Sequence, residues 1–184
     1  MSPKRNGVRT LKTPRLLLRG LTVEDADALF AVLRDKRLTR YVAWEHHRSI
    51  EQTVFYLLSL ESAYRDAGLK EWGVFDAGSG ALFGTCGFVR LEEAHARGEI
   101  GYTIGREHQG RGLATECAAA VMRFGFEELG LHRVEAQVVV GNAASARVLE
   151  KIGMRREAVL EGRARIRRRF VDVEMFARVR PARS

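Results

Sequence analysis

The stretch QGRGLAT at residues 109–115 decides how this chain is interpreted, because it follows an apolar segment and opens a helical pattern. Its two glycines allow the backbone to come close to a ligand, and the N–H groups of a first helical turn have no acceptors within the helix. Such a turn is an anion site suited to a pyrophosphate. The stretch lacks the Gly-Lys-Ser/Thr of a P-loop and does not match the GxGxxG fingerprint. A pair of glycines alone is more often a tight turn, so a second motif is needed.

A second stretch, NAASARVLEKIGM at residues 142–154, contains a short helical pattern that ends at a glycine. Asn142 is placed to cap this helix, and Ser145 lies in its first turn. A serine in a first turn usually serves local structure, so Ser145 alone indicates no function. The two stretches lie about thirty residues apart, and their combination is much more specific than either one.

The surrounding apolar patterns predict an α+β chain in the order β-α-α-β-β-β-α-β-α-β-β. Strands are expected at 15–21, 70–76, 82–91, 99–104, 132–140, 155–160 and 171–178. The three strands at 70–76, 82–91 and 99–104 indicate an antiparallel meander. Helices are expected from Thr22 onward, at 49–65, at 113–129 and at 143–151. Residues 41–48 are expected to form a loop, and an arginine-rich segment, 163–169, is expected between the last two strands.

The chain has 184 residues, a length typical of one domain. We expect a single domain over residues 1–184, with a core over about 11–180 and short basic tails. A composition of 46% hydrophobic and 29% charged residues excludes collagen-like and wholly disordered chains. Apolar stretches are far shorter than the about 18 residues of a membrane span, and the polar N-terminus does not resemble a signal peptide. Cys86 and Cys117 lack metal-ligand spacing, so we expect a reduced, cytoplasmic setting, no metal and no membrane partner.

Positive charge is concentrated at the two ends of the chain, whose net charge is +8. Residues 1–20 contain six Lys or Arg and no acidic residue, and residues 155–184 contain ten Arg and four acidic residues. The middle of the chain is net negative. Basic ends suit anionic partners such as RNA, a ribosome surface or ligand phosphates. Solvated arginines on an ordinary surface are the alternative.

The pattern Q-x-x-G-x-A at 109–114, followed by N-x-x-S-x-x-V-L-E-K-I-G-M at 142–154, resembles the GNAT acetyltransferase superfamily. Further stretches resemble its ribosomal-protein N-terminal alanine or serine acetyltransferase (RimJ/RimL-like) branch. They are TPRLLLR at 13–19, GTCGF at 84–88, EIGY at 99–102 and ATE at 114–116. The resemblance covers about residues 11–180. It implies a central, mostly antiparallel twisted sheet with splayed central strands and helices on both faces.

The resemblance also implies where acetyl-CoA, the expected cosubstrate, binds: in a V between the strands at 99–104 and 132–140. Main-chain groups near Ile104 are expected to bond the pantetheine arm like an added strand. Asn142 is expected to contact this arm, and Ser145 to lie near the sulfur. The pyrophosphate is expected on the backbone of Gln109, Gly110, Arg111, Gly112, Leu113, Ala114 and Thr115.

The implied reaction is direct transfer of acetyl from the thioester to an amine, so the chain is expected to be an N-acetyltransferase. The amine must be neutral to attack, a base must take its proton, and the thiolate must be stabilised. Glu99 is the candidate base, through a water; its alternative role is a paired surface carboxylate at a strand start. Ser145 is the candidate donor to the thiol, because no tyrosine follows Tyr102 to act as the general acid of many superfamily members. An N–H near Ile104 or Gly105 is the candidate donor to the thioester oxygen.

The acceptor amine is less well determined. At pH 7 roughly one in ten α-amines is neutral, against roughly a few in ten thousand lysine amines. A weakly supported Glu base therefore suits a protein N-terminal α-amine, such as that of a ribosomal protein. A small amine (a polyamine, an amino acid or an antibiotic) is the alternative, and a non-catalytic acyl-CoA-binding module is the third hypothesis. Trp44 is a candidate wall of the acceptor site, with core packing as its alternative. We expect a monomer or homodimer.

Overall fold

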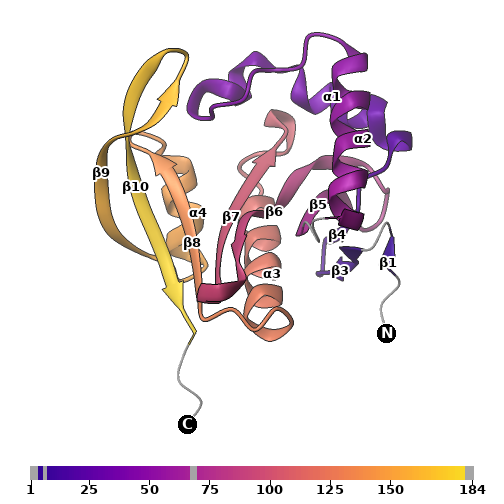
Figure 1. The fold of residues 1–184 in the computed structure, drawn as a ribbon. Coiled ribbons are helices and arrows are strands. Elements are labelled where there is room, and N and C mark those ends of the chain that lie inside the picture. Colours follow the sequence, from indigo (N-terminus) through magenta and orange to yellow (C-terminus); the bar gives the residue numbers. More distant parts are fainter. Residues whose placement is uncertain (1–3, 6–7, 67–69, 181–184) are drawn as a thin grey trace.

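The structure, a computed structural model, describes residues 4–5, 8–66 and 70–180. Its main feature is one eight-stranded sheet in the order β3-β4-β5-β6-β7-β8-β10-β9 (Figure 1). The strands of this sheet are β3 (Leu11–Lys12), β4 (Leu16–Arg19), β5 (Lys70–Asp76), β6 (Leu82–Glu92), β7 (Arg97–Ile104), β8 (Arg133–Val139), β9 (Arg155–Ile166) and β10 (Arg169–Val179). Neighbouring strands are antiparallel except β7 and β8, so the expected mostly antiparallel sheet is confirmed.

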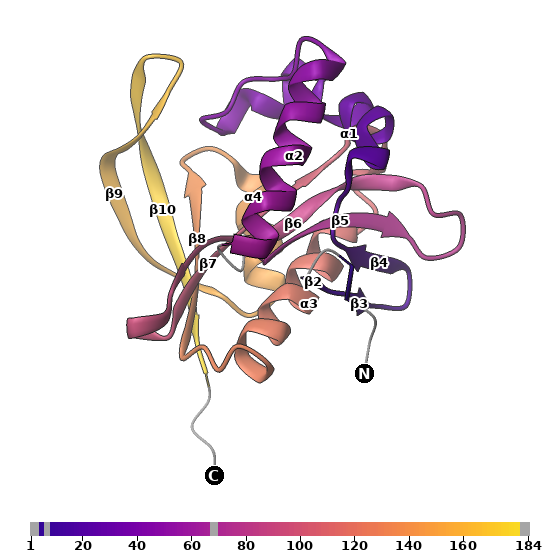
Figure 2. The same ribbon diagram turned by 45° about the vertical axis from the view of Figure 1, so that its right-hand side comes forward.

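Helices cover both faces of this sheet, as expected (Figure 2). They are α1 (Ala26–Leu33) and α2 (Ile50–Asp66) on one face, and α3 (Leu113–Glu127) and α4 (Ala143–Lys151) on the other. Trp72 of β5 meets Phe124 of α3 edge to face, with the ring centroids 5.3 Å apart. Because successive side chains of a strand alternate between faces, the neighbouring Glu71 points to the side of α1 and α2.

β7 and β8 separate after three residue pairs. Their parallel register runs from Arg97 opposite Arg133 to Glu99 opposite Glu135 and ends there. The ladder between β6 and β7 skips Val89 beside the last of these pairs, and such a bulge increases the local twist of a strand. The carboxyl ends of β7 and β8 therefore diverge (Figure 1), which confirms the expected splayed central strands.

The start of the first long helix differs from the prediction. Thr22 begins a short 3-10 turn, η1 (Val23–Asp25), and α1 follows it at Ala26. The carboxylate of Asp25 accepts a hydrogen bond from the N–H of Thr22 at 2.9 Å. The predicted start at Thr22 is therefore the start of the 3-10 turn, and the α-helix begins one turn later, at Ala26. A longer 3-10 segment, η2 (Lys36–Tyr41), precedes the expected loop.

The C-terminal hairpin also differs from the prediction. β9 continues to Ile166 and β10 begins at Arg169, so most of the segment 163–169 is strand. The two turn residues, Arg167 and Arg168, have φ values of 46° and 68°. Two-residue hairpin turns favour Asn and Gly at such angles. Since neither residue type marks this turn, the sequence contains no hairpin signal there.

Short strands before residue 13 were not predicted either. β1 (Lys4–Arg5) pairs with β2 (Val8–Arg9), and β3 pairs with β4. These basic residues lack the apolar alternation that predicts a strand. Among the helices of the described residues, none combines the length and apolarity of a membrane span. Within the same residues, no three His, Cys, Asp or Glu gather closely enough to hold a metal ion.

Two glycines bring α3 close to the sheet. A Cβ atom at Gly98 of β7 would lie 2.7 Å from the ring of Phe88, and one at Gly125 of α3 would also lie 2.7 Å from it. The ring of Phe88 is 1% exposed, so it cannot move aside into solvent. Only glycine fits at these positions, and α3 is thereby held against β6 and β7.

We expect Gly125→Ala to destabilise the fold, although alanine is the better helix former by about 1 kcal/mol. The added methyl group would overlap an enclosed ring, and overpacking costs about 1–3 kcal/mol. A net loss of about 1 kcal/mol in the free energy of unfolding should be measurable by urea denaturation. The control is Gly78→Ala in an exposed turn, where the Cβ would lie 3.5 Å from the nearest atom. A more stable Gly125→Ala variant would contradict this packing.

Candidate active site

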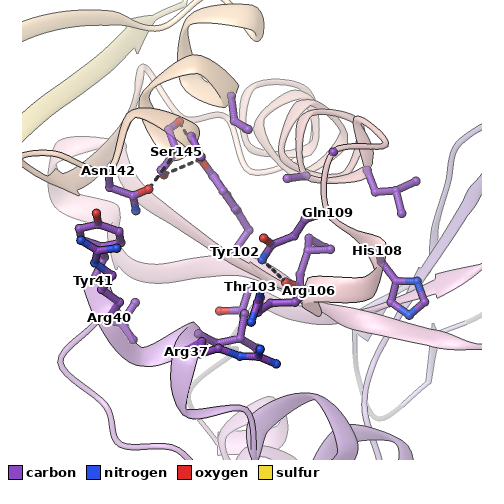
Figure 3. A pocket seen from close by; sticks show the side chains of 18 of the residues that line it. Arg37, Arg40, Tyr41, Tyr102, Thr103, Arg106, His108, Gln109, Asn142 and Ser145 are labelled. Atoms are coloured by element: carbon purple, nitrogen blue, oxygen red, sulfur yellow. Dashed lines mark hydrogen bonds between the residues drawn. The ribbon is translucent and has the colours of Figure 1, made fainter.

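A basic cleft of about 980 Å³ lies beside the split between β7 and β8. Its walls come from the end of β7, the start of α3, α4 and η2 (Figure 3). Its described lining residues include seven basic side chains and no Asp or Glu. The basic residues are Lys36, Arg37, Arg40, Arg106, Arg147, Lys151 and Arg167. Such a concentration of positive charge suits a ligand with several phosphate groups.

The start of α3 has the geometry of an anion site. Gly110 and Gly112 have φ values of 75° and 77°, in the left-handed region that favours glycine. The N–H of Glu116 donates to the carbonyl of Gly112 at 3.1 Å and forms the first helical hydrogen bond. The N–H groups of residues 113–115 therefore have no acceptor within the helix. Residues 113–115 also line the basic cleft.

Two side chains hold this turn in place. Gln109 Nε2 donates to the carbonyl of Ile104 at 2.8 Å, and Arg15 Nη1 donates to the carbonyl of Arg111 at 2.9 Å. The guanidinium of Arg111 lies 5.7 Å from the centroid of the Phe83 ring. Within 109–115, Arg111 is the residue that does not line the cleft. Its backbone belongs to the turn, whereas its side chain packs elsewhere.

Glu116 joins this turn to the beginning of the sheet. Its Oε1 accepts hydrogen bonds from Thr13 Oγ1 at 2.6 Å and from the N–H of Arg15 at 3.0 Å, and its Oε2 accepts from Arg15 Nε at 2.7 Å. Burial alone would raise the pKa of Glu116, but the hydrogen bonds from Thr13 and Arg15 and the charge of Arg15 hold it below its usual range. Glu116 is thus fully occupied in positioning α3.

Replacement of Glu116 by Gln should remove a pH-dependent contribution to stability. Since folding lowers the pKa of Glu116 below its ordinary 4.5, the stabilisation is complete above about pH 4.5 and is lost as the pH falls through the folded-state pKa. The wild type should exceed Glu116→Gln by about 1–2 kcal/mol at pH 7. Urea denaturation from about pH 3 to about pH 7 would measure the difference. A difference in the free energy of unfolding that stays constant with pH would refute this prediction. The control is Glu161→Gln, because Glu161 is exposed.

The outer edge of β7 beyond Glu99 has no neighbour among the described strands. The N–H of Gly105 donates to the carbonyl of Phe83 in β6 at 2.8 Å, so it is not available to a ligand. Antiparallel ladders alternate between groups that bond the neighbouring strand and groups that point away. The main-chain groups of Ile104 therefore point toward the split, where its carbonyl accepts the hydrogen bond from Gln109 Nε2. Of the two N–H groups considered for the thioester oxygen, only that of Ile104 is free of a partner in β6.

Tyr102 of β7 reaches the start of α4, which the sequence analysis did not anticipate (Figure 3). Its hydroxyl lies 2.8 Å from Ser145 Oγ and 3.1 Å from the Ser145 carbonyl oxygen. Asn142 caps α4, because its Oδ1 accepts from the N–H of Ser145 at 3.3 Å. Burial raises the pKa of Tyr102, so its hydroxyl is protonated at neutral pH. A pair of hydroxyl groups, and not Ser145 alone, faces the cleft.

The sequence contains one signal for this pair. In the stretch EIGY, Tyr102 has the same strand phase as the buried Ile100, which places it on the side of α3 and α4. Tyr102 comes from a strand that precedes the Asn142 helix, so it does not occupy the position after that helix where many superfamily members have a tyrosine.

A second cavity of about 630 Å³ adjoins the basic cleft. The two share six lining residues, which are Tyr41, Val42, Tyr102, Thr103, Asn142 and Ser145. The lining of the second cavity includes Glu71 and Glu99 and, among its described residues, no Lys or Arg. The two cavities therefore have opposite charge, in a chain whose net charge is +8.

Glu99, Trp44 and His47 all line this second cavity. Glu99 Oε2 accepts from Gln137 Nε2 at 3.1 Å across the split, and within the described residues no Lys or Arg forms an ion pair with it. Trp44 is half-buried, packs against the hydrophobic core and also lines this cavity. Burial, and then the charge of His46, lower the pKa of His47, which keeps it neutral at pH 7.

Two hydrogen bonds cross the open side of the cleft. Arg167 Nη2 at the hairpin tip donates to Thr39 Oγ1 of η2 at 2.9 Å. The hydroxyl of Tyr41 donates to the carbonyl of Gly141, before α4, at 3.3 Å. η2 is thereby tied to the strands and helix on the far side of the split, and the cleft is covered on this side.

Known proteins share this arrangement. A family model described as acetyltransferase (GNAT) domain matches residues 15–155. The uncharacterized N-acetyltransferase YoaA of Bacillus subtilis is 40% identical over 150 residues, which cover 82% of this chain and 85% of YoaA. A GNAT-family acetyltransferase from Bacillus anthracis has a TM-score of 0.82 at 28% identity, over 92% of this chain and 98% of that one. RimL, a ribosomal alpha-N-protein acetyltransferase solved with coenzyme A, shares the fold with a TM-score of 0.84 at 22% identity, over 93% and 98% of the two chains.

A sheet that splits beside a helix start with unpaired N–H groups, together with these matches, defines an acyl-transferring enzyme. The chain belongs to the GNAT family of N-acetyltransferases, and ribosomal-protein acetyltransferases are among its structural neighbours.

Proposed function

We propose that this N-acetyltransferase takes acetyl from acetyl-CoA and transfers it to the N-terminal α-amine of a protein. The opposite charge of two adjoining cavities carries the proposal. A cleft with seven basic side chains suits the phosphates of acetyl-CoA, and a cavity that contains Glu71 and Glu99 suits a cationic amine.

The residues that would hold acetyl-CoA surround the split. The backbone N–H groups of 110–115 would bind the pyrophosphate, since the N–H of Gln109 donates to the carbonyl of Arg106 at 3.2 Å. Main-chain groups near Ile104 would bond the pantetheine arm, and Asn142 would contact this arm. The unpaired first turn of α3 and the free edge of β7 support these roles. When bound, acetyl-CoA supplies the acetyl group as a thioester.

The transfer requires groups of the chain to remove the amine proton, to stabilise the thiolate and to stabilise the thioester oxygen. The neutral amine nitrogen attacks the thioester carbon, so that a C–N bond forms and the C–S bond breaks. Glu99 takes the proton that leaves the nitrogen, through a water. The thiolate accepts a hydrogen bond from the hydroxyl pair of Ser145 and Tyr102, which stabilises its charge, and takes its proton from solvent. The N–H of Ile104 is the candidate donor to the thioester oxygen.

Several features favour a protein N-terminus as the acceptor. Glu99 has one neutral hydrogen-bond donor, Gln137, and no described ion pair, so it is a plain carboxylate base. Such a base suits an α-amine, of which roughly one in ten is neutral at pH 7. RimL, with the same fold, acts on a ribosomal protein. A ribosomal acceptor would also give the arginine-rich C-terminal residues an RNA neighbour in the cytoplasm.

Acetyl-CoA consumption, read as free thiol, should occur with peptides that begin with Ala, Ser or Met. The same panel contains polyamines, amino acids and amine antibiotics. Turnover of one small amine alone would replace the proposal by the small-amine alternative, which the acidic second cavity also suits. Binding of acetyl-CoA without turnover of any acceptor would favour a non-catalytic acyl-CoA-binding module.

Glu99→Gln should lower kcat at pH 7 by about 100-fold, the lower end of what a general base contributes. Higher pH should partly restore the rate, because more of the amine is then deprotonated in solution. The KM for acetyl-CoA should stay near the wild-type value. Steady-state kinetics across pH would test this, with the exposed Glu93→Gln as control. An unchanged rate and pH profile would remove the assignment of Glu99 as base.

A further inference from the structure

Glu71 of β5 is a carboxylate of the second cavity that the reaction above does not use. The ladder places Glu71 opposite Gly87 of β6, and Gly87 opposite Gly101 of β7. Residues in such a row point to the same face of a sheet, and all three line the second cavity. Two glycines therefore separate Glu71 from the edge of β7 at the split, and the side chain of Val89 in the bulge of β6 lies beside the second of them, Gly101.

The absence of a side chain at Gly87 is a steric requirement. A Cβ atom at Gly87 would lie 2.5 Å from the Cα of Glu71 and 2.5 Å from the carbonyl oxygen of Lys70. Both are backbone atoms, which cannot rotate away. The floor of the cavity at Gly87, next to Glu71, thus carries no side chain.

The carboxylate of Glu71 is held in position by neutral groups. The hydroxyl of Tyr56 donates to its Oε1 at 2.9 Å, and the side chain of buried Thr85 forms a second hydrogen bond. The hydroxyl of Tyr64 donates to the Glu71 carbonyl at 2.9 Å, which fixes the backbone. Burial raises the pKa of Glu71, and the hydrogen bonds from Tyr56 and Thr85 oppose this rise.

The surroundings of Glu71 supply no counter-charge. No described Lys, Arg or His forms an ion pair with it, and His47 in the same cavity is kept neutral by burial. A carboxylate withdrawn from water is unfavourable until a cation pairs with it. The cavity is thus prepared for a positive charge that the described residues do not provide.

We propose that Glu71 binds a second cationic group of the acceptor while the reacting amine lies at the split. Two strand spacings, about 10 Å, separate the backbone of Glu71 from the edge of β7. At this distance Glu71 cannot contact the reacting nitrogen at the split. A lysine side chain at the second residue of a peptide is long enough to reach Glu71, and so is a diamine, because the Glu71 side chain covers part of the distance. The inference rests on the proposed function and defines its acceptor class, an amine with a second positive charge.

The test compares acceptors that differ in this charge alone. Peptides that begin Ala-Lys and Ala-Gln, and the pair 1,4-diaminobutane and n-butylamine, are assayed by their kcat/KM. The wild type should prefer the doubly charged member of a pair by about tenfold or more, as expected for a hydrogen bond to a charged group. Glu71→Gln, which keeps the shape and the bond from Tyr56, should bring the ratio close to one, through KM of the acceptor.

Controls separate this role from a structural one. Glu71→Asp should retain part of the preference, and Glu51→Gln, on the exposed face of the same helix as Tyr56, should retain all of it. The free energy of unfolding of Glu71→Gln should equal or exceed that of the wild type, because a buried charge is removed. A wild type without preference, or a Glu71→Gln variant with the wild-type ratio, would overturn the proposal.

A binding measurement keeps this outcome apart from failure of the proposed function. Calorimetric titration of 1,4-diaminobutane into the protein saturated with coenzyme A requires no turnover. Tighter binding than that of n-butylamine, lost in Glu71→Gln, would support the role of Glu71 even if no peptide is acetylated. Equal binding of the two amines would overturn it even if peptides are good acceptors.

Discussion

The parting of β7 and β8 after three residue pairs is the constraint on which the site depends. A ladder continued along both strands would occupy the main-chain groups of Ile104 and close the sheet below α3. Because the strands diverge instead, the free edge of β7 and the first turns of α3 and α4 face one gap. Both cavities open onto this gap and share Tyr102 and Ser145, so the hydroxyl pair lies at their junction.

Electrostatics divides the gap into two parts. The basic side chains of the cleft come from η2, the turn after β7 that contains Arg106, α4 and the hairpin tip, whereas Glu71 and Glu99 come from the face of the sheet. Arginines closer to the sheet have other partners: Arg97 pairs with Glu92, and Arg133 pairs with Glu135 and Glu157. The carboxylates of the second cavity are thereby left to a ligand, although the chain as a whole is strongly positive.

Features encoded locally could be predicted from the sequence, and features made by distant segments could not. The strand at 70–76 and the helix at 143–151 have the predicted bounds. The turn residues at 77–80 mark the end of the strand, and a capping Asn142 and a stop glycine mark the ends of the helix. The glycine turn before α3 is likewise contained in one stretch. In contrast, whether the N–H of Ile104 or that of Gly105 is free for a ligand depends on which of them bonds β6 in the sheet. The pairs Tyr102–Ser145 and Tyr56–Glu71 form only when separate elements pack together.

The bare floor at Gly87 has a consequence for how acceptor preference can change between related chains. Any side chain at position 87 would clash with the backbone of β5, so Gly87 cannot be replaced without moving that strand. The wall of the cavity formed by residues 41–48 is under no such backbone restriction, because this segment, which contains Trp44, lies outside the sheet. Differences in acceptor choice between related chains should therefore accumulate in residues 41–48, whereas the split and its glycines should stay unchanged.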